Sequence, residues 1–134
     1  TVGPIYRNGQ HGEPELLENC YRNSLRLAKE NRLRTIAFPS ISTGVYGYPI
    51  EEAAQIAIRT IDTFLKENPE IQQVTMCCFS GYDKSVYTKA LEQLTSRNVE
   101  TPLLAFVLDI ATIRPAQITK HGGKHHFQAV LINI

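Results

Sequence analysis

Three stretches of the chain carry apolar residues every three or four positions, the spacing that places them on one face of a helix. We expect helices over residues 14–31, from residue 50 to Asn68, and over residues 85–94. Pro14 and Pro49 suit helix starts, because the first turn leaves N–H groups without helical partners and proline has none. The expected core faces of the first two helices comprise Leu17, Tyr21, Ser24 or Leu25, and Ala28, then Ala54, Ala57, Ile58, Ile61 and Leu65.

Short continuous apolar runs separate these helices and predict strands over residues 35–40 and 74–79. The second run has the composition of a strand buried on both faces of a parallel sheet. A further short strand is expected at residues 2–6, where Gly3 and Pro4 interrupt it. Strands that alternate with helices predict an α/β layered domain with right-handed crossovers.

The alternation does not continue through the last part of the chain, which holds two strand-like runs at residues 103–108 and 127–132. We therefore expect one unit over residues 1–95. The remaining residues, 96–134, are expected to form an extension that is either disordered or patches the sheet. The full length of 134 residues leaves room for one domain with a modest core.

The composition limits the cellular location and the kinds of binding partner that we expect. Lys and Arg total 14 against 13 Asp and Glu, and the net charge of +1 creates no broad field that would attract nucleic acid or an anionic membrane. The longest apolar run, residues 102–113, is shorter than the ~20 residues that cross a bilayer. Three cysteines, two of them adjacent in an apolar run, resemble buried thiols of a reducing compartment. A cytoplasmic protein is expected.

Candidate chemistry gathers in residues 40–49, a glycine-containing loop between an expected strand and an expected helix. Gly44 and Gly47 permit backbone conformations closed to other residues, so that successive N–H groups can turn toward an anion near the positive end of the helix. The loop contains no lysine and does not fit the pattern of a nucleoside triphosphatase. It therefore predicts a diphosphate that is bound intact.

Other candidate sites have simpler interpretations. His121, His125 and His126 are separated by glycines and have no carboxylate or cysteine nearby in the sequence, which indicates a solvated turn and no metal site. Cys77 and Cys78 lie in an expected buried strand, where thiols have raised pKa values and are inert as nucleophiles.

Three polar or aromatic side chains keep two interpretations each. Tyr46 and Tyr48 either cover the loop or line a ligand cleft. Asp83 either caps the last helix or forms a hydrogen bond with a ligand, and capping is the commoner role for aspartate at such a position.

Four stretches, in this order, resemble the C-terminal half of a macrodomain, the ADP-ribose-binding fold, in its MacroD-like O-acetyl-ADP-ribose deacetylase branch. They are residues 1–6, 16–25, 36–49 and 78–83, followed by Tyr87. The third stretch, Ile-Ala-Phe-Pro-Ser-Ile-Ser-Thr-Gly-Val-Tyr-Gly-Tyr-Pro, is highly specific. The resemblance, which covers about residues 1–94, implies a three-layer α/β fold with a mixed sheet that lacks its N-terminal strands.

The resemblance also implies the ligand and its contacts. The diphosphate of ADP-ribose would be cradled by Ser42, Thr43, Gly44, Val45 and Tyr46. The distal ribose would lie beside Gly47 and Tyr48, and the adenine would stack on Phe79. Backbone amides suit phosphate oxygens, and an aromatic side chain at the end of a strand offers a flat apolar face to a base.

The family's first half, with its catalytic groups, has no matching positions here, so the catalytic residues are unknown. The chain begins at Thr1, in mid-strand by its pattern, and we expect the natural start to lie upstream. Residues 96–134 match nothing in the family. The main hypothesis is a protein that binds ADP-ribose or its derivatives. Its intact form would hydrolyse O-acetyl-ADP-ribose or remove ADP-ribose from proteins, without a cofactor or metal.

Two other hypotheses remain open from the sequence. The first is a noncatalytic ADP-ribose reader or an inactive remnant, because half of the pocket would be missing. The second is a different phosphate-binding α/β protein whose sheet includes residues 127–132.

Overall fold

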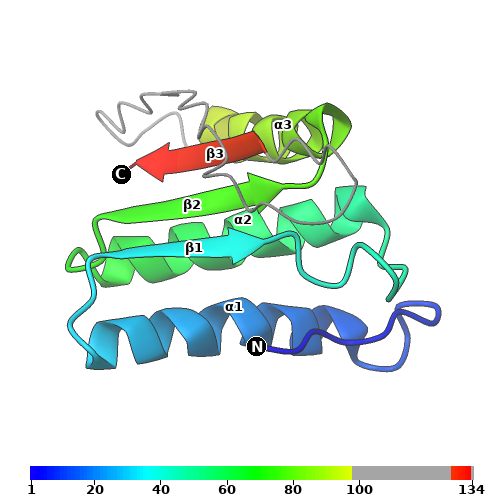
Figure 1. Cartoon of the computed structure of the whole chain (residues 1–134), viewed down its shortest axis with the longest axis horizontal. Helices are drawn as coiled ribbons and strands as arrows, with labels where there is room; N and C mark the ends of the chain where they lie inside the picture. Colours follow the sequence, from blue (N-terminus) through cyan, green and yellow to red (C-terminus); the bar gives the residue numbers. More distant parts are fainter. Residues whose placement is uncertain (98–127, 134) are drawn as a thin grey trace, which may run out of the picture.

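The computed structural model describes residues 1–97 and the strand at residues 128–133. Its elements in chain order are α1 (Glu13–Glu30), β1 (Thr35–Pro39), α2 (Ile50–Glu67), β2 (Gln73–Cys78), α3 (Gly81–Arg97) and β3 (Gln128–Asn133) (Figure 1). The sheet has the order β1-β2-β3, with β1 parallel to β2 and β3 antiparallel to β2. The expected α/β class and mixed sheet are therefore confirmed.

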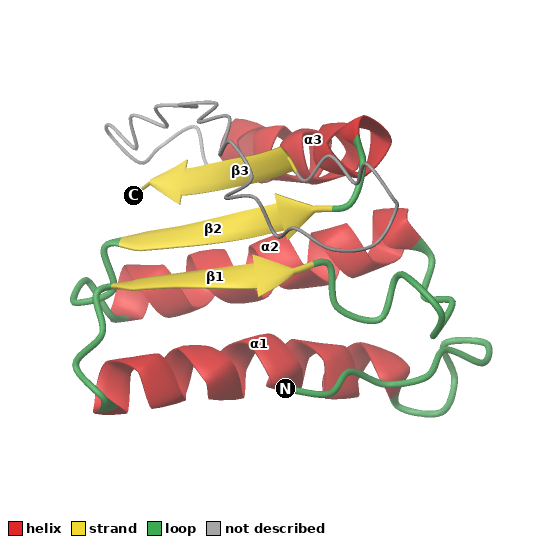
Figure 2. Cartoon of the chain, viewed as in Figure 1, coloured by secondary structure: helices red, strands yellow, loops and turns green. Residues whose placement is uncertain are grey.

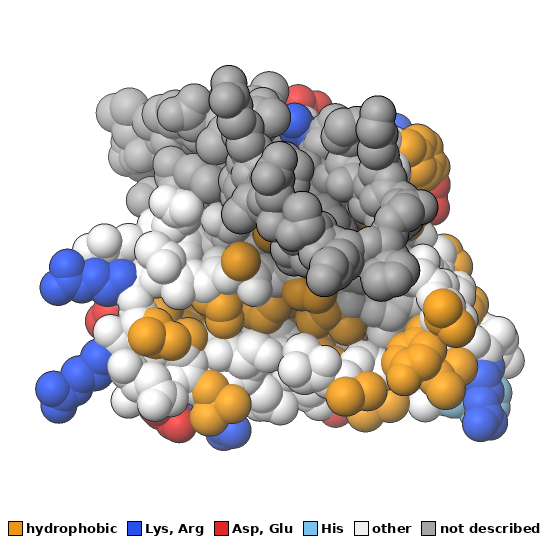
Figure 3. Space-filling view, in the orientation of Figure 1, with side chains coloured by type: hydrophobic (Ala, Val, Ile, Leu, Met, Phe, Trp, Pro, Cys, Tyr) orange, Lys and Arg blue, Asp and Glu red, His pale blue; other side chains and the backbone are white. Residues whose placement is uncertain are grey.

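The three helices lie side by side behind the sheet in the view of Figure 2, with α2 between α1 and α3. The exposure of β1 alternates accordingly. Phe38 is buried toward the helices, whereas Thr35, Ala37 and Pro39 are exposed. Figure 3 shows hydrophobic side chains gathered in a band across the face turned away from the helices. The described part of the chain thus forms two layers, a sheet and one layer of helices.

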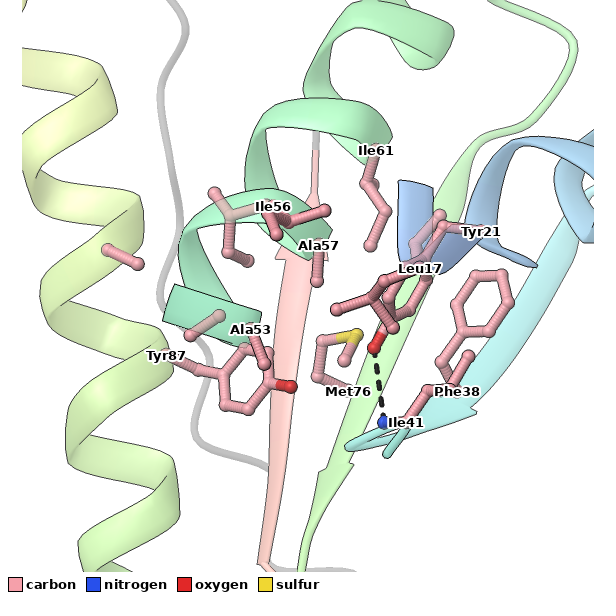
Figure 4. Close-up of a cluster of buried hydrophobic side chains, with 14 of the residues drawn as sticks. Leu17, Tyr21, Phe38, Ile41, Ala53, Ile56, Ala57, Ile61, Met76 and Tyr87 are labelled. Carbon is pink, nitrogen blue, oxygen red and sulfur yellow. Dashed lines mark hydrogen bonds between the residues drawn. The ribbon is translucent and has the colours of Figure 1, made fainter. Parts of the chain in front are cut away.

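The predicted helix faces are confirmed as the core. Leu17, Tyr21 and Leu25 of α1 are fully buried, and the ring of Tyr21 meets Phe38 of β1 edge-on at 5.0 Å between centroids. Figure 4 shows this contact beside Met76 of β2. All the apolar positions predicted for α2 are also buried, namely Ala54, Ala57, Ile58, Ile61 and Leu65. These side chains fix the helix layer against the start of the loop that follows β1.

The expected strand at residues 2–6 is wrong, because these residues form an irregular segment. Pro4 has no N–H to donate to a neighbouring strand. Gly3 has no side chain, so its backbone can approach the neighbouring loop more closely than that of another residue. The segment instead lies against the loop after β1, where the Tyr6 N–H donates to the Tyr46 carbonyl at 2.9 Å.

The third helix begins four residues before its predicted start, because Ser80 caps it. The Ser80 hydroxyl accepts the Asp83 N–H at 3.1 Å, and the Ser80 carbonyl accepts the Lys84 N–H at 3.0 Å. Asp83 therefore lies in the first turn and does not cap the helix. The sequence carried this signal, since serine followed three residues later by an acidic residue is typical of a helix start.

The extension contributes β3, which pairs with β2 from Gln73↔Asn133 to Cys78↔Gln128. The run expected at residues 103–108, and the three histidines of the expected solvated turn, lie outside the described residues. The boundary at residue 95 stays a prediction. None of the helices described here is both long enough and apolar enough to cross a membrane.

Candidate functional site

The loop between β1 and α2, residues 40–49, lies at the carboxyl edge of the sheet. Because β1 and β2 are parallel and Pro39 is level with Cys77, the residues just after both strands emerge at the same edge. Phe79 follows β2 there and is 62% exposed. The structure thus brings the predicted loop and the predicted aromatic residue to one edge, the usual place for ligands in open α/β sheets.

Five successive backbone N–H groups in this loop, those of residues 42–46, have no hydrogen-bond partner in the described part of the chain. Their neighbours are paired. The Gly47 N–H donates to the Gly44 carbonyl at 3.0 Å, and the Tyr48 N–H donates to the Ser42 carbonyl at 2.9 Å. These two bonds fold the loop back on itself and leave the intervening donors available. Such a run of donors is suited to an anion.

Backbone conformation in the loop differs from the sequence prediction at one glycine. Gly47 has φ 69°, as expected for a residue that needs glycine. Gly44 is not in the left-handed region, and a Cβ built on it would meet no atom within 4 Å. The left-handed position falls on Ser42, with φ 66°. The expected conformational role of Gly44 is therefore wrong, and Ser42 carries the strained backbone.

The side chains of the loop divide between surface and interior. Val45 is fully exposed, and Tyr46 is 37% exposed. Tyr48 is buried to 2% exposure and packs against Tyr6 at 4.7 Å between ring centroids. Burial and the nearby Glu52 carboxylate raise the pKa of its phenol. Tyr48 thus supports the loop from within, and Tyr46 is the tyrosine that faces solvent.

The electrostatic character of the loop comes from its backbone. Residues 35–50 include no charged side chain. Beyond them, Glu51 is hydrogen-bonded to the Tyr82 hydroxyl at 2.6 Å, a contact that lowers the pKa of the carboxyl. Within residues 35–50, only N–H dipoles and hydroxyl groups are therefore available to hold an anion.

Of the two cysteines of the strand, Cys78 is buried and is not activated as a nucleophile, whereas Cys77 is only half-buried. Burial, followed by the Asp83 carboxylate, raises the pKa of Cys78 to about 12, so its thiol stays protonated at neutral pH. Among the residues that the structure describes, no three His, Cys, Asp or Glu side chains lie close enough to hold a metal ion.

Sequence reasoning missed Gly3, whose backbone lies directly against the loop. A Cβ at this position would lie 2.2 Å from Ser42 Oγ and 2.4 Å from Ile41 Cγ2. Ser42 Oγ is itself buried without a partner in the described part of the chain. The N-terminal segment can therefore pack against the loop only with glycine at this position.

We expect Gly3→Ala to lower the free energy of unfolding by roughly 1–3 kcal/mol, the usual effect of overpacking a close contact. The added methyl group would push the segment away from Ile41 and weaken the bond between Tyr6 and Tyr46. Urea unfolding monitored by circular dichroism would measure the change. Gly44→Ala is the matched control, because its Cβ enters open space. Equal stability of the two variants would contradict the close packing.

Comparisons with known proteins agree with this architecture. A family model described as Macro domain matches residues 1–57. A macro domain-containing protein of Chlorobaculum tepidum is 60% identical over 68% of this chain and 53% of its own length. A protein of Salmonella newport named O-acetyl-ADP-ribose deacetylase is 50% identical over 69% of this chain and 52% of its own length.

Solved structures give the same result. A mutant of the Oceanobacillus iheyensis macrodomain, in a structure with ADPR (ADP-ribose), superimposes with a TM-score of 0.68 at 52% identity. The match covers 72% of this chain and 51% of that one. The chain therefore spans about half the length of the relatives that it matches.

Proposed function

Because this chain belongs to the macrodomain family as a partial domain, we propose that it binds ADP-ribose or O-acetyl-ADP-ribose by the diphosphate. The observation that carries the proposal is the run of five N–H groups in residues 42–46 that have no partner in the described part of the chain. Phosphate oxygens accept such donors without a counter-charge from lysine or arginine. The relative named O-acetyl-ADP-ribose deacetylase and the macrodomain mutant in a structure with ADP-ribose support this choice of ligand.

We assign the remaining contacts by position. The diphosphate lies against the amides of Ser42, Thr43, Gly44, Val45 and Tyr46, and the distal ribose lies near Gly47 and Tyr48. Phe79, exposed at the end of β2, stacks on the adenine. The buried ring of Tyr48 acts from beneath the loop, so its contribution to the ribose site comes through its backbone.

We further propose that a complete domain of this kind hydrolyses O-acetyl-ADP-ribose or removes ADP-ribose from proteins. In such chemistry the loop orients the substrate while water attacks the bond, and positioning supplies the protein's share of the rate. The activity, its catalytic residues and a cytoplasmic location remain predictions. The alternative is a noncatalytic ADP-ribose reader or an inactive remnant.

Calorimetric titration with ADP-ribose tests the binding proposal, with AMP as comparator and circular dichroism as the check on folding. We expect saturable binding that prefers ADP-ribose, because AMP lacks the second phosphate that the amide array can accept. A folded chain that binds neither ligand would overturn the proposal. Release of acetate from O-acetyl-ADP-ribose by a chain that binds would favour the enzyme, and binding without release would favour the reader.

A further inference from the structure

We infer that Tyr87 of α3 is a positioning residue for the proposed diphosphate loop and acts through the hydroxyl groups of Ser40 and Thr43. The inference rests on the proposed function for its effect on binding. Its effect on the loop itself does not depend on any ligand. Tyr87 has no role in the site as described so far, and it comes from the helix that follows the second parallel strand.

The three hydroxyl groups form a chain beneath the loop. The hydroxyls of Tyr87 and Ser40 lie 2.7 Å apart, and the hydroxyls of Ser40 and Thr43 also lie 2.7 Å apart. The Thr43 hydroxyl lies in addition 3.1 Å from the Ser40 carbonyl oxygen. Tyr87 is fully buried, so water has little access to the Tyr87 end of this chain of bonds.

These hydroxyl groups bond to one another and to the backbone of Ser40. The Thr43 hydroxyl donates to Ser40, whose hydroxyl and carbonyl oxygens both lie within reach, and either hydroxyl of the Tyr87–Ser40 pair can be the donor. The donors left for a ligand are then the backbone N–H groups of residues 42–46.

A second tyrosine, Tyr21, forms a hydrogen bond with Ile41, the residue that follows Ser40. The Tyr21 hydroxyl accepts the Ile41 N–H at 3.3 Å, and Figure 4 shows Tyr21 from α1 and Tyr87 from α3 on opposite sides of Met76. Two buried side chains, one from each outer helix, thus fix two successive residues at the root of the loop. Ser40 is the one tied to Tyr87.

The hydrogen bonds with Tyr87 and Tyr21 matter because few hydrogen bonds within the loop hold its conformation. Two backbone bonds, from Gly47 and Tyr48, fold it back on itself, and Ser42 is held in a left-handed conformation that serine rarely adopts. A loop released from Ser40 would spend part of its time in other conformations, in which the amides no longer present the same set of donors to a ligand. Apparent affinity then falls by the fraction of time spent in the competent state.

The experiment uses the full chain carrying Tyr87→Phe or, as a second variant, Ser40→Ala. Thr88→Val is the matched control, since it removes another α3 hydroxyl, one that donates to the Lys84 carbonyl away from the loop. Hydrogen exchange followed by NMR measures the amides of Gly47 and Tyr48 without ligand. We expect both to exchange faster in the two test variants than in the control, while amides in the middle of α2 keep their rates.

The second readout is calorimetric affinity for ADP-ribose, which we expect to fall roughly 3- to 10-fold in Tyr87→Phe, the change that one hydrogen bond is worth. Unchanged exchange at Gly47 and Tyr48 would overturn the positioning role. Faster exchange with unchanged affinity would overturn its importance for binding. If the unaltered chain binds no ADP-ribose, the proposed function fails, and the exchange rates still decide whether Tyr87 positions the loop.

Discussion

Gly44→Glu is expected to abolish ADP-ribose binding while the chain stays folded. Gly44 is not in a left-handed conformation and a Cβ on it meets open space, so the substitution strains nothing. The new carboxylate would lie among the N–H groups of residues 42–46, which have no partner within the described residues, and could itself accept hydrogen bonds from them. It would also repel the diphosphate, and like charges brought together cost several kcal/mol, which corresponds to a loss of about 100-fold or more.

Calorimetry with ADP-ribose measures this loss, and two variants serve as controls. Gly44→Ala adds a methyl group without charge and is expected to weaken binding far less than the glutamate. Gln55→Glu places the same charge on the exposed surface of α2, outside the loop, and tests whether any added negative charge has the effect. Full affinity in a folded Gly44→Glu variant would show that the diphosphate lies elsewhere.

The sequence predicted those parts of the fold that depend on local periodicity. Each helix was found because its apolar residues recur every three or four positions, and β2 because its apolar run is continuous. The error at residues 2–6 has a physical cause. The composition resembled a strand, but tertiary contact with Ile41 and Ser42 decided the conformation. Local preference is weak enough for such contacts to override it.

The sequence predicted the anion-binding backbone of the candidate site. It did not predict the buried side chains that hold the loop in place. Glycines and hydroxyl residues between a strand and a helix indicated an anion loop from nearby residues alone. The bond from Tyr87 to Ser40 joins residues 47 positions apart, and the bond from Tyr21 to Ile41 joins residues 20 apart. Periodicity marks Tyr21 as a core residue but does not show where its hydroxyl points.

That double role makes Tyr21 the residue whose loss should cost the most stability. Its side chain is fully buried, its ring meets Phe38 edge-on, and its hydroxyl accepts the Ile41 N–H (Figure 4). Removing the ring leaves a cavity between α1 and β1. We expect Tyr21→Ala to lower the free energy of unfolding by about 3–5 kcal/mol, as aromatic truncations in a core do. Small domains have about 5–15 kcal/mol in total.

Urea unfolding measures the loss, and Tyr21→Phe separates the two contributions of this side chain. The phenylalanine keeps the ring contact with Phe38 and removes the acceptor of the Ile41 N–H. We expect it to cost about 1–2 kcal/mol, the effect of leaving one buried donor unpaired. The ring would then account for most of the loss in Tyr21→Ala. A Tyr21→Ala variant within about 1 kcal/mol of the unaltered chain would contradict a core in which this ring joins α1 to the sheet.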